Sequence, residues 1–438
     1  MGASVDEARG ICIIGAGSSG VAVGKALKQA GLGFDCFEIG SDLGGMWRYE
    51  NDNGLSSAYR SLHIDTSSGN LAYSDFPCPA GGPDFLSHRE VLRYLESYAD
   101  HFGVRDHIRF STPVRHVTQA DGGGWDVTLG DGEVRHYASV VVANGHLWDP
   151  RLPDFPGEFG GTAMHSHHYR TAAPFVGQDV LVVGLGNSAV DIAVDVCKQA
   201  GSTLVSTRRS AWIMPKYLMG IPIDRWSGVL ARRLRLPTPA VRAIIGQLMR
   251  LAQGNQERFG VPRPAHPIWR EHATLSQELL PYAGHGWITI KPDVAALEHD
   301  AVRFADGSTS HVDAIIYATG YRFSFPFLDP AMMRLGDGEV SLYRRMAAPD
   351  CPGLYFAGLV QPIGPTIPLV ELQARWLAGV LGGQTRLPSP EVMRQEIEDH
   401  RSAVARRYVN STRYILEVDF RRYARQMAAD TRRGQAGR

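Results

Sequence analysis

The sequence has few cysteines, and none is placed for disulfide redox chemistry or zinc binding. Five cysteines are scattered over 438 residues, and no two of them form a CxxC pair. Widely spaced cysteines of this kind are typical of reducing compartments. We therefore expect a cytoplasmic protein, and the missing CxxC pair disfavours a pyridine-nucleotide disulfide reductase.

Long apolar runs and net charge are also absent. No stretch approaches the ~18 consecutive apolar residues of a membrane-spanning helix, and 45 basic residues balance 45 acidic ones. The totals argue against disorder and against a polyanion-binding surface. We expect a globular protein with no membrane span and no nucleic-acid partner. At about 150 residues per domain, the length allows two or three domains.

Two stretches share one pattern of strand, glycine-rich turn, helix and strand. The strands at 11–14 and 180–183 are each followed by such a turn. The first turn is Gly15-Ala16-Gly17-Ser18-Ser19-Gly20, and the second is Gly184-Leu185-Gly186-Asn187-Ser188-Ala189. Between a strand and a helix, this spacing is typical of dinucleotide binding, because glycines let the backbone approach a pyrophosphate at the helix N-terminus. The alternatives are two purely structural turns, with Asn187 and Ser188 as helix caps.

The residues that end each second strand distinguish the two nucleotides. Glu38 stands 23 residues after the first glycine of the first turn, and Thr207, followed by Arg208 and Arg209, stands 23 after that of the second. A carboxylate accepts hydrogen bonds from a ribose diol, whereas two arginines suit a 2′-phosphate. The first unit is therefore predicted to bind FAD and the second NADPH.

The order of these units predicts an interrupted domain. We expect an α/β fold of two Rossmann-like, three-layer dinucleotide-binding domains, with the NADPH domain inserted into the FAD domain. The predicted boundaries are residues 1–170 for the first part of the FAD domain, 171–292 for the NADPH domain, and 293–438 for the second part with a C-terminal helical segment.

A further motif lies between the two turns and carries a family resemblance. Residues 159–169, from Phe159 through His165 to Tyr169, fit FxGxxxHxxxY. Together with the two dinucleotide motifs, this segment resembles the flavin-containing monooxygenases. The resemblance implies that Gly15 to Gly20 contact the FAD pyrophosphate, Glu38 the ribose, and Met46 and Trp47 the flavin. It implies NADP contacts for Ser188 to Asp191, Arg208 and Arg209, and it places Asp65 and Thr66 near flavin and nicotinamide.

The resemblance also implies a reaction. NADPH would reduce the flavin, O₂ would add to it as a C4a-(hydro)peroxide, and one oxygen atom would pass to a soft nucleophile, an amine or a sulfide. The cofactor carries the difficult chemistry, so no metal is predicted. We expect small-molecule substrates and O₂ as partners, and a homo-oligomer, namely a dimer.

One residue departs from the family pattern. Asp65 stands where the family usually has asparagine, and a carboxylate only accepts hydrogen bonds unless it is protonated. An ionised Asp65 would disfavour a peroxide anion and favour oxygenation of nitrogen or sulfur. Baeyer–Villiger relatives have an aspartate at about this place, paired with arginine, so oxidation of a ketone is the alternative. A flavin-bound NADPH oxidase or sensor is a third possibility.

Two segments have other interpretations. His165, His167 and His168 form a cluster that could bind a metal, although we favour hydrogen bonding at a domain junction. Residues 224–260 are basic with helical spacing, which fits a membrane-surface or partner-binding helix pair, or a solvated cover over a core.

Overall fold

The first glycine turn follows the central strand of a seven-stranded sheet. In the computed structural model, which describes residues 9–436 apart from 234, 271–272, 334–340 and 408–415, β1 lies parallel to both β2 and β6. The strands are β1 (Arg9–Ile14), β2 (Phe34–Phe37), β3 (Ile108–Arg109), β4 (Val114–Gln119), β5 (Trp125–Leu129), β6 (Val134–Val142) and β22 (Leu354–Phe356). β4 and β5 extend the sheet as an antiparallel pair.

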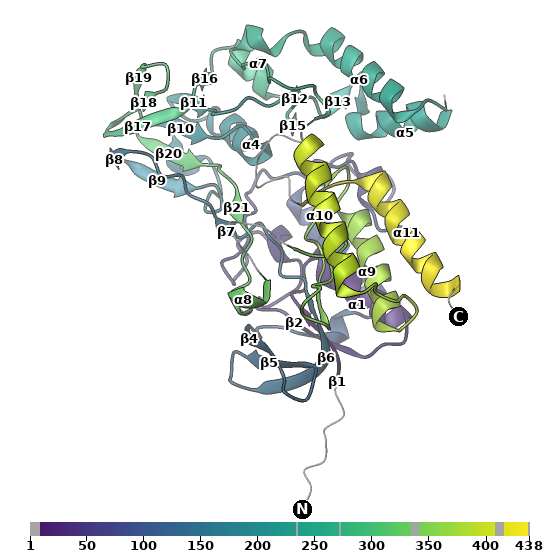
Figure 1. The fold of residues 1–438 in the computed structure, drawn as a ribbon. Coiled ribbons are helices and arrows are strands. Elements are labelled where there is room, and N and C mark those ends of the chain that lie inside the picture. Colours follow the sequence, from purple (N-terminus) through teal and green to yellow (C-terminus); the bar gives the residue numbers. More distant parts are fainter. Residues whose placement is uncertain (1–8, 234, 271–272, 334–340, 408–415, 437–438) are drawn as a thin grey trace, which may run out of the picture.

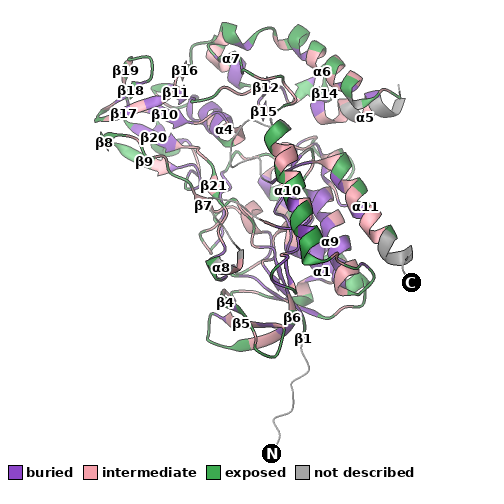
Figure 2. Cartoon of the chain, viewed as in Figure 1, coloured by how far each residue is buried: buried purple, intermediate pink, exposed green. Residues whose placement is uncertain are grey.

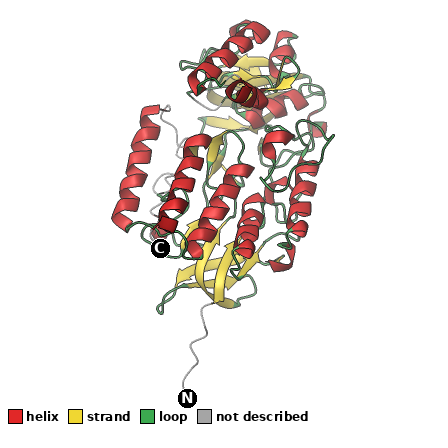
Figure 3. Ribbon diagram, turned by 90° about the vertical axis from the view of Figure 1, so that its right-hand side faces the viewer, coloured by secondary structure: helices red, strands yellow, loops and turns green. Residues whose placement is uncertain are grey.

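Helices cover one face of this sheet, as Figure 3 shows. They are α1 (Ser18–Gln29), α3 (His88–His101) and α9 (Ile367–Leu381), with α10 (Pro390–Arg407) and α11 (Phe420–Ala436) outside α9. Residues alternate between the two faces along each strand. Ile13 and Cys36 therefore join the core under the helices, whereas Cys12 and Phe37 join a second core on the opposite face.

The second glycine turn follows the central strand of a five-stranded parallel sheet. Its strand order is β16-β11-β10-β20-β9. The strands are β9 (Thr162–His165), β10 (Asp179–Val183), β11 (Ser202–Ser206), β16 (Thr289–Lys291) and β20 (Ala314–Tyr317). Val182 faces the core shared with α4 (Asn187–Val196) and α7 (Leu279–Gly284), and Leu181 faces the opposite core. That core is closed by β8 (Gly157–Phe159), β17 (Val294–His299), β18 (Ala301–Phe304) and β19 (Thr309–His311).

Shorter elements connect and cover the two sheets. Two helices, α5 (Ile223–Arg233) and α6 (Thr238–Gln253), form the basic stretch and enclose a small core of their own. The remaining elements are α2 (Ser68–Leu71), α8 (Pro330–Met333), β12 (Ile213–Met214), β13 (Tyr217–Leu218), β14 (Ile221–Pro222), β15 (Thr274–Leu275), β23 (Gln361–Ile363) and β24 (Glu417–Asp419).

The chain crosses between the two sheets through a short antiparallel pair. β7 (Asp149–Pro150) pairs with β21 (Tyr321–Arg322), and Figure 1 shows this pair between the two units. All strands of the second sheet come from residues 162–317, between β6 and β22 of the first sheet. The predicted fold class, an α/β domain inserted into another, is therefore confirmed.

The boundaries given for the inserted domain stay predictions. Two strands of its sheet, β9 and β20, lie outside the range 171–292. The helices of the described residues include none that is long and apolar enough to cross a membrane.

Candidate functional site

The first glycine turn brings backbone close to backbone at positions where a side chain could not fit. Gly15 has φ of +100°, and a Cβ there would lie 2.7 Å from the Ala143 carbonyl oxygen. A Cβ on Gly20 would lie 1.8 Å from the Gly15 carbonyl oxygen. Gly17 caps α1 without a side-chain hydrogen bond, and the first turn of α1 has no acidic residue. The helix N-terminus therefore keeps N–H groups for an anionic ligand.

Glu38 is held against this turn by the backbone. Its two carboxylate oxygens accept hydrogen bonds from the Ala16 N–H at 2.7 Å and the Gly40 N–H at 2.8 Å. Only 4% of Glu38 is exposed, and this burial raises the pKa of its carboxyl group. Met46 and Trp47 lie in a one-turn 3₁₀ helix, Gly45–Trp47, beside the turn, where Gly45 approaches Gly17.

The second turn has the same construction. Gly184 has φ of +128°, and a Cβ there would lie 2.6 Å from the Ala318 carbonyl oxygen. Gly186 caps α4, again without a side-chain hydrogen bond. Arg208 and Arg209 follow β11 and are exposed, and no ion pair of either is described. Two cations thus stand at the end of the strand next to the turn.

Asp65 joins the two domains at this second turn. The Asn187 amide donates a hydrogen bond to Asp65 Oδ2 at 2.7 Å, and Lys216 Nζ pairs with Asp65 Oδ1 at 3.0 Å. Asn187 Oδ1 in turn accepts the Leu275 N–H at 3.0 Å. Both donors need an acceptor, and the two carboxyl oxygens of Asp65 provide one for each. The Asn187 side chain therefore bonds to Asp65 of the other domain. It does not cap α4, which has no side-chain cap at its N-terminus.

Helix α4 presents two more carboxylates to the same junction. Asp191 Oδ2 accepts a hydrogen bond from the Tyr59 hydroxyl at 3.0 Å, and Asp195 Oδ2 accepts those of Tyr169 at 2.6 Å and Ser61 at 3.0 Å. Because they lie four residues apart, the two aspartates share one face of the helix. Tyr169, the last residue of the FxGxxxHxxxY motif, thereby anchors the domain junction.

Burial and charge act in opposite directions on the ionisable groups at this junction. Burial and the negative charge of Asp65 raise the pKa of Asp191 to about 7, although Lys216 and Tyr59 lower it. Burial lowers the pKa of Lys216, but the charges of Asp65 and Asp191 outweigh it and the pKa is raised. Lys216 thus remains a cation between two carboxyl groups.

Lys216 and Tyr59 are functional candidates that the sequence analysis did not assign. Lys216 lies 151 residues from Asp65, and Tyr59 lies 132 residues from Asp191. Nothing local to either residue indicates its partner. The one usable signal for Tyr59 was its place six residues before Asp65.

The histidines of the motif contact the backbone. His165 Nδ1 accepts the His167 N–H at 3.0 Å, and His167 Nε2 lies 3.2 Å from the Gly54 carbonyl oxygen. Burial lowers the pKa of His165 to about 4, so it is neutral at physiological pH. These contacts agree with hydrogen bonding at the domain junction.

The basic helix pair lies over the junction. Asp224 accepts hydrogen bonds from the Ser67 N–H at 2.9 Å and the Asn70 amide at 3.0 Å, just beyond Asp65. Arg225 pairs with Asp84 at 2.9 Å, and Arg242 of α6 lies 3.6 Å from Asp419. The helices α5 and α6 therefore form a cover that is tied to the FAD domain.

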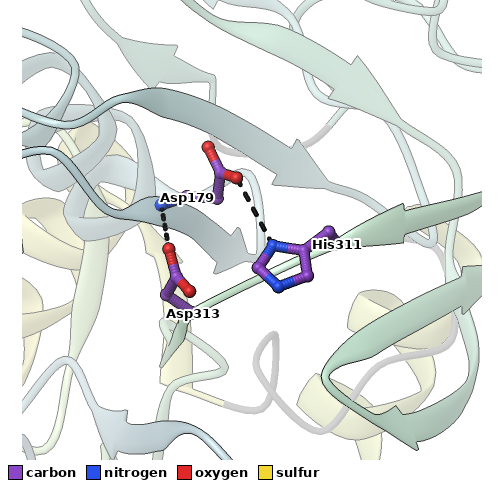
Figure 4. A group of neighbouring side chains, drawn as sticks. All are labelled: Asp179, His311 and Asp313. Atoms are coloured by element: carbon purple, nitrogen blue, oxygen red, sulfur yellow. Dashed lines mark hydrogen bonds and ion pairs between the residues drawn. The ribbon is translucent and has the colours of Figure 1, made fainter.

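Two other features lie apart from this junction. Asp179, His311 and Asp313 come together at the start of β10, the opposite end from Gly184 (Figure 4). Their carboxylates already accept hydrogen bonds from Ser202 and from the Asp179 N–H, and His311 and Asp313 are exposed. A cavity of ≈ 930 Å³ lies between α6 and residues 263–268, and no predicted site residue lines it.

Comparison with known proteins agrees with this geometry. The model of the flavin-binding monooxygenase-like family matches residues 8–432. This chain belongs to that family. It is 36% identical over 435 residues to "Flavin-containing monooxygenase 5" of Rattus norvegicus, covering 94% of this chain and 80% of that protein. It is 35% identical to "Dimethylaniline monooxygenase [N-oxide-forming] 2" of the same species, covering 96% and 82%.

A solved structure adds a similar fold. The S-allyl-L-cysteine S-oxygenase from Allium sativum is 27% identical, with a TM-score of 0.72 over 96% of this chain and 88% of that one. The chain is therefore a flavin-binding monooxygenase. The individual residues assigned to each cofactor stay predictions.

The raised pKa of Asp191 predicts a pH dependence of stability. Between pH about 4 and 7 the folded chain holds a proton on Asp191 that the unfolded chain has lost, so the native state loses stability as pH rises. Asp191→Asn lacks this titrating group. The difference between its denaturation midpoint and that of the parent protein should therefore shift in favour of the variant as pH rises from about 4 to 7. Tyr59→Phe removes a group that lowers this pKa and should extend the loss to higher pH. A difference that is independent of pH would contradict the assignment.

Proposed function

We propose that this enzyme transfers one oxygen atom of O₂ to the nitrogen or sulfur atom of a small amine or sulfide. The observation that carries the proposal is the pair of contacts made by Asp65. They link the first domain to Asn187 and Lys216 beside the second glycine turn. A contact between the two domains at this place would bring both cofactors to one site. The N-oxide-forming and S-oxygenating relatives support the same substrate classes.

The residues of the first domain fit FAD. Uncapped N–H groups of α1 stand ready for the pyrophosphate, and Gly17 at the N-cap has no side chain that would obstruct it. Glu38, fixed by two backbone N–H groups, would accept the ribose hydroxyls. Met46 and Trp47 lie beside the turn and would contact the flavin.

The residues of the second domain fit NADPH. Uncapped N–H groups of α4 and the exposed Ser188 would bind the pyrophosphate. Arg208 and Arg209 would bind the 2′-phosphate through charge-assisted hydrogen bonds. Because the Asn187 amide is engaged by Asp65 and Leu275, it would position the nucleotide through those contacts.

The chain's own contribution to the reaction is position, dryness and charge. When bound, FAD accepts a hydride from NADPH and activates O₂. Asn187 and Lys216 hold Asp65 in its acceptor form, and Lys216 offsets its charge at 3.0 Å. The α5–α6 cover, fixed through Asp224, would exclude water from the junction.

The Asp65–Lys216 pair also keeps ketone oxidation as a second candidate. An aspartate paired with a cation is the arrangement expected for an oxidant that attacks a carbonyl carbon, because the cation stabilises negative charge there. In this chain the cation is lysine. A lysine ammonium is a compact charge and cannot bind a carboxylate through two parallel hydrogen bonds as an arginine does. The second oxygen of Asp65 is therefore bound by the Asn187 amide.

Three further assignments complete the proposal. The inserted NADPH domain would comprise residues 171–292, and β9 and β20 would complete its sheet from outside that range. The chain would function as a homodimer. It would function in the cytoplasm, since its five cysteines are all free, as is usual in a reducing compartment.

We expect the double variant Arg208→Ala/Arg209→Ala to lose its preference for NADPH. The KM for NADPH should rise at least about tenfold, because each arginine contributes a hydrogen bond between charged groups. The KM for NADH should change little. Arg115→Ala, which removes an exposed arginine of β4, is the matched control. An undiminished ratio of NADH to NADPH KM values would refute the assignment of the 2′-phosphate.

Lys216→Met should separate the two substrate classes. It leaves Asp65 with an uncompensated charge, so ester formation from a ketone should fall at least about tenfold and sulfoxide or N-oxide formation should fall less. Lys216→Arg should restore part of the activity. Lys198→Met, which removes an exposed lysine paired with Glu278, is the control.

The assay compares products with NADPH consumed and H₂O₂ released. Equal losses for all substrates in Lys216→Met would contradict a selective role for the pair. H₂O₂ without any oxygenated product in the parent enzyme would instead support an NADPH oxidase.

A further inference from the structure

Two arginines occupy a turn whose backbone conformation disfavours them. Arg344 and Arg345 have φ of +53° and +62°, and the Met346 N–H bonds to the Tyr343 carbonyl at 2.9 Å across them. Two consecutive residues with positive φ are usual in a two-residue hairpin turn, where Asn-Gly is preferred. Side chains with a Cβ are strained in this region, and such strain is concentrated at functional sites.

The two arginines differ in how well they are paired. Arg344 binds Asp430 of α11 at 2.9 and 3.2 Å and Glu396 of α10 at 3.0 Å. Arg345 is only 6% exposed. Its described contacts are long, 3.4 Å to the Leu342 carbonyl and 3.5 Å to Glu396 Oε2. Burial lowers the pKa of Arg345. A buried guanidinium with such weak partners is costly in free energy.

Arg345 lines a cavity between the turn and the C-terminal helices. The cavity has a volume of ≈ 50 Å³ and is also lined by Glu396, His400, Glu417 and Arg422. A water molecule needs roughly 10–15 Å³ on the same measure, so the cavity admits a small polyatomic ion. Figure 1 shows α10 and α11 beside α9, and Figure 2 shows α9 mostly buried beneath them. Arg422, which is exposed, lies where the cavity meets solvent.

The electrostatic field in this cavity is positive at His400. The Nε2 atom of His400 is buried without a hydrogen-bond partner. Burial first, and then the positive charges of Arg345, Arg422 and Arg344, lower the pKa of His400 to about 3.

The acidic side chains around the cavity are largely engaged elsewhere. Glu396 Oε1 is bound by Arg344, and Asp419 pairs with Arg242 and accepts the Arg422 N–H at 3.2 Å. Among the described residues that line the cavity, the donors with weak partners or none are Arg345 and His400. Glu417 and Oε2 of Glu396 are buried beside them, so an anion would have to bind at the arginine side of the cavity.

We propose that this cavity is a binding site for a small oxyanion, of the phosphate or carboxylate type, held by Arg345 and Arg422. His400 takes up a proton as the anion enters and adds a third donor. The site is lined by residues of β24 and shares no residue with the predicted cofactor contacts.

Hydrogen bonds connect the cavity to Gly358, which packs closely against Ser19 of the first glycine turn. The Tyr423 hydroxyl donates to the Arg344 carbonyl at 2.5 Å and accepts the Gln373 amide at 2.9 Å. Gln373 Oε1 in turn accepts the Gly358 N–H at 2.9 Å, and a Cβ on Gly358 would collide with Ser19. An anion that fixes the turn therefore stabilises the helix layer beside FAD.

The test is a calorimetric titration of the enzyme with inorganic phosphate at constant ionic strength in chloride. FAD and NADP⁺ are kept saturating, so that neither nucleotide site can bind the phosphate. We expect one phosphate per chain, with proton uptake detected in buffers of different ionisation enthalpy. Sulfate and acetate arms distinguish a tetrahedral oxyanion from a carboxylate, and saturable binding of either supports the site. Binding of none of the three beyond chloride would overturn it.

Variants locate the site. Arg345→Met and Arg422→Gln should each weaken binding at least about tenfold. Arg425→Gln, an exposed neighbour on α11 outside the cavity, should leave binding unchanged. Undiminished binding in both Arg345→Met and Arg422→Gln would overturn the assignment. Because Arg422 is exposed, its variant is expected to fold and carries the test if Arg345→Met does not.

Thermal stability without phosphate distinguishes a ligand site from a structural arginine. If Arg345 is a ligand-binding residue, its buried charge lacks a strong partner when no anion is bound. Arg345→Met should then melt at the same or a higher temperature than the parent protein in phosphate-free buffer. Phosphate should raise the midpoint of the parent protein but not that of Arg345→Met. A folded Arg345→Met protein with a lower midpoint in phosphate-free buffer would show a structural role and contradict the proposal.

Discussion

The carboxylate of Asp65 makes the contacts on which the arrangement of the candidate site depends. It comes from the FAD domain and is held by an amide and a cation of the NADPH domain. A half-buried carboxylate needs such partners, because burial without them would cost more than the contact contributes. The same requirement fixes Lys216 and Asn187, so three side chains determine how the two dinucleotide turns face each other.

Other contacts around this pair hold the two domains in the same arrangement. Tyr59 and Tyr169 donate to two aspartates on one face of α4, and Asp224 ties the cover helices to the segment after Asp65. In each of these contacts a half-buried carboxylate accepts hydrogen bonds from the other domain or from the linking motif. The junction is therefore polar and specific, as expected for a site between domains that must admit two cofactors.

Much of the fold could be predicted because its determinants are local. A buried strand, closely spaced glycines and a helix specify a dinucleotide turn within about 30 residues, and Glu38 and the two arginines follow at a fixed distance. The order of the two units also predicts the insertion.

The contacts at the junction could not be predicted in this way. Asn187 was interpretable as a cap or a nucleotide contact, and its bond to Asp65 depends on a partner 122 residues away. Lys216 and Arg345 each sit in a segment whose local sequence shows no function. Their importance comes from burial and charge, which only the folded chain defines.

The most direct test is the rate of flavin reduction by saturating NADPH without oxygen, measured in a double-mutant cycle of Asp65→Asn and Lys216→Met. If the pair aligns the two cofactors, each single variant should slow reduction, and the double variant should be no slower than the worse single one. The coupling free energy should then be on the order of 1 kcal/mol or more. Additive effects, with no coupling, would contradict the account.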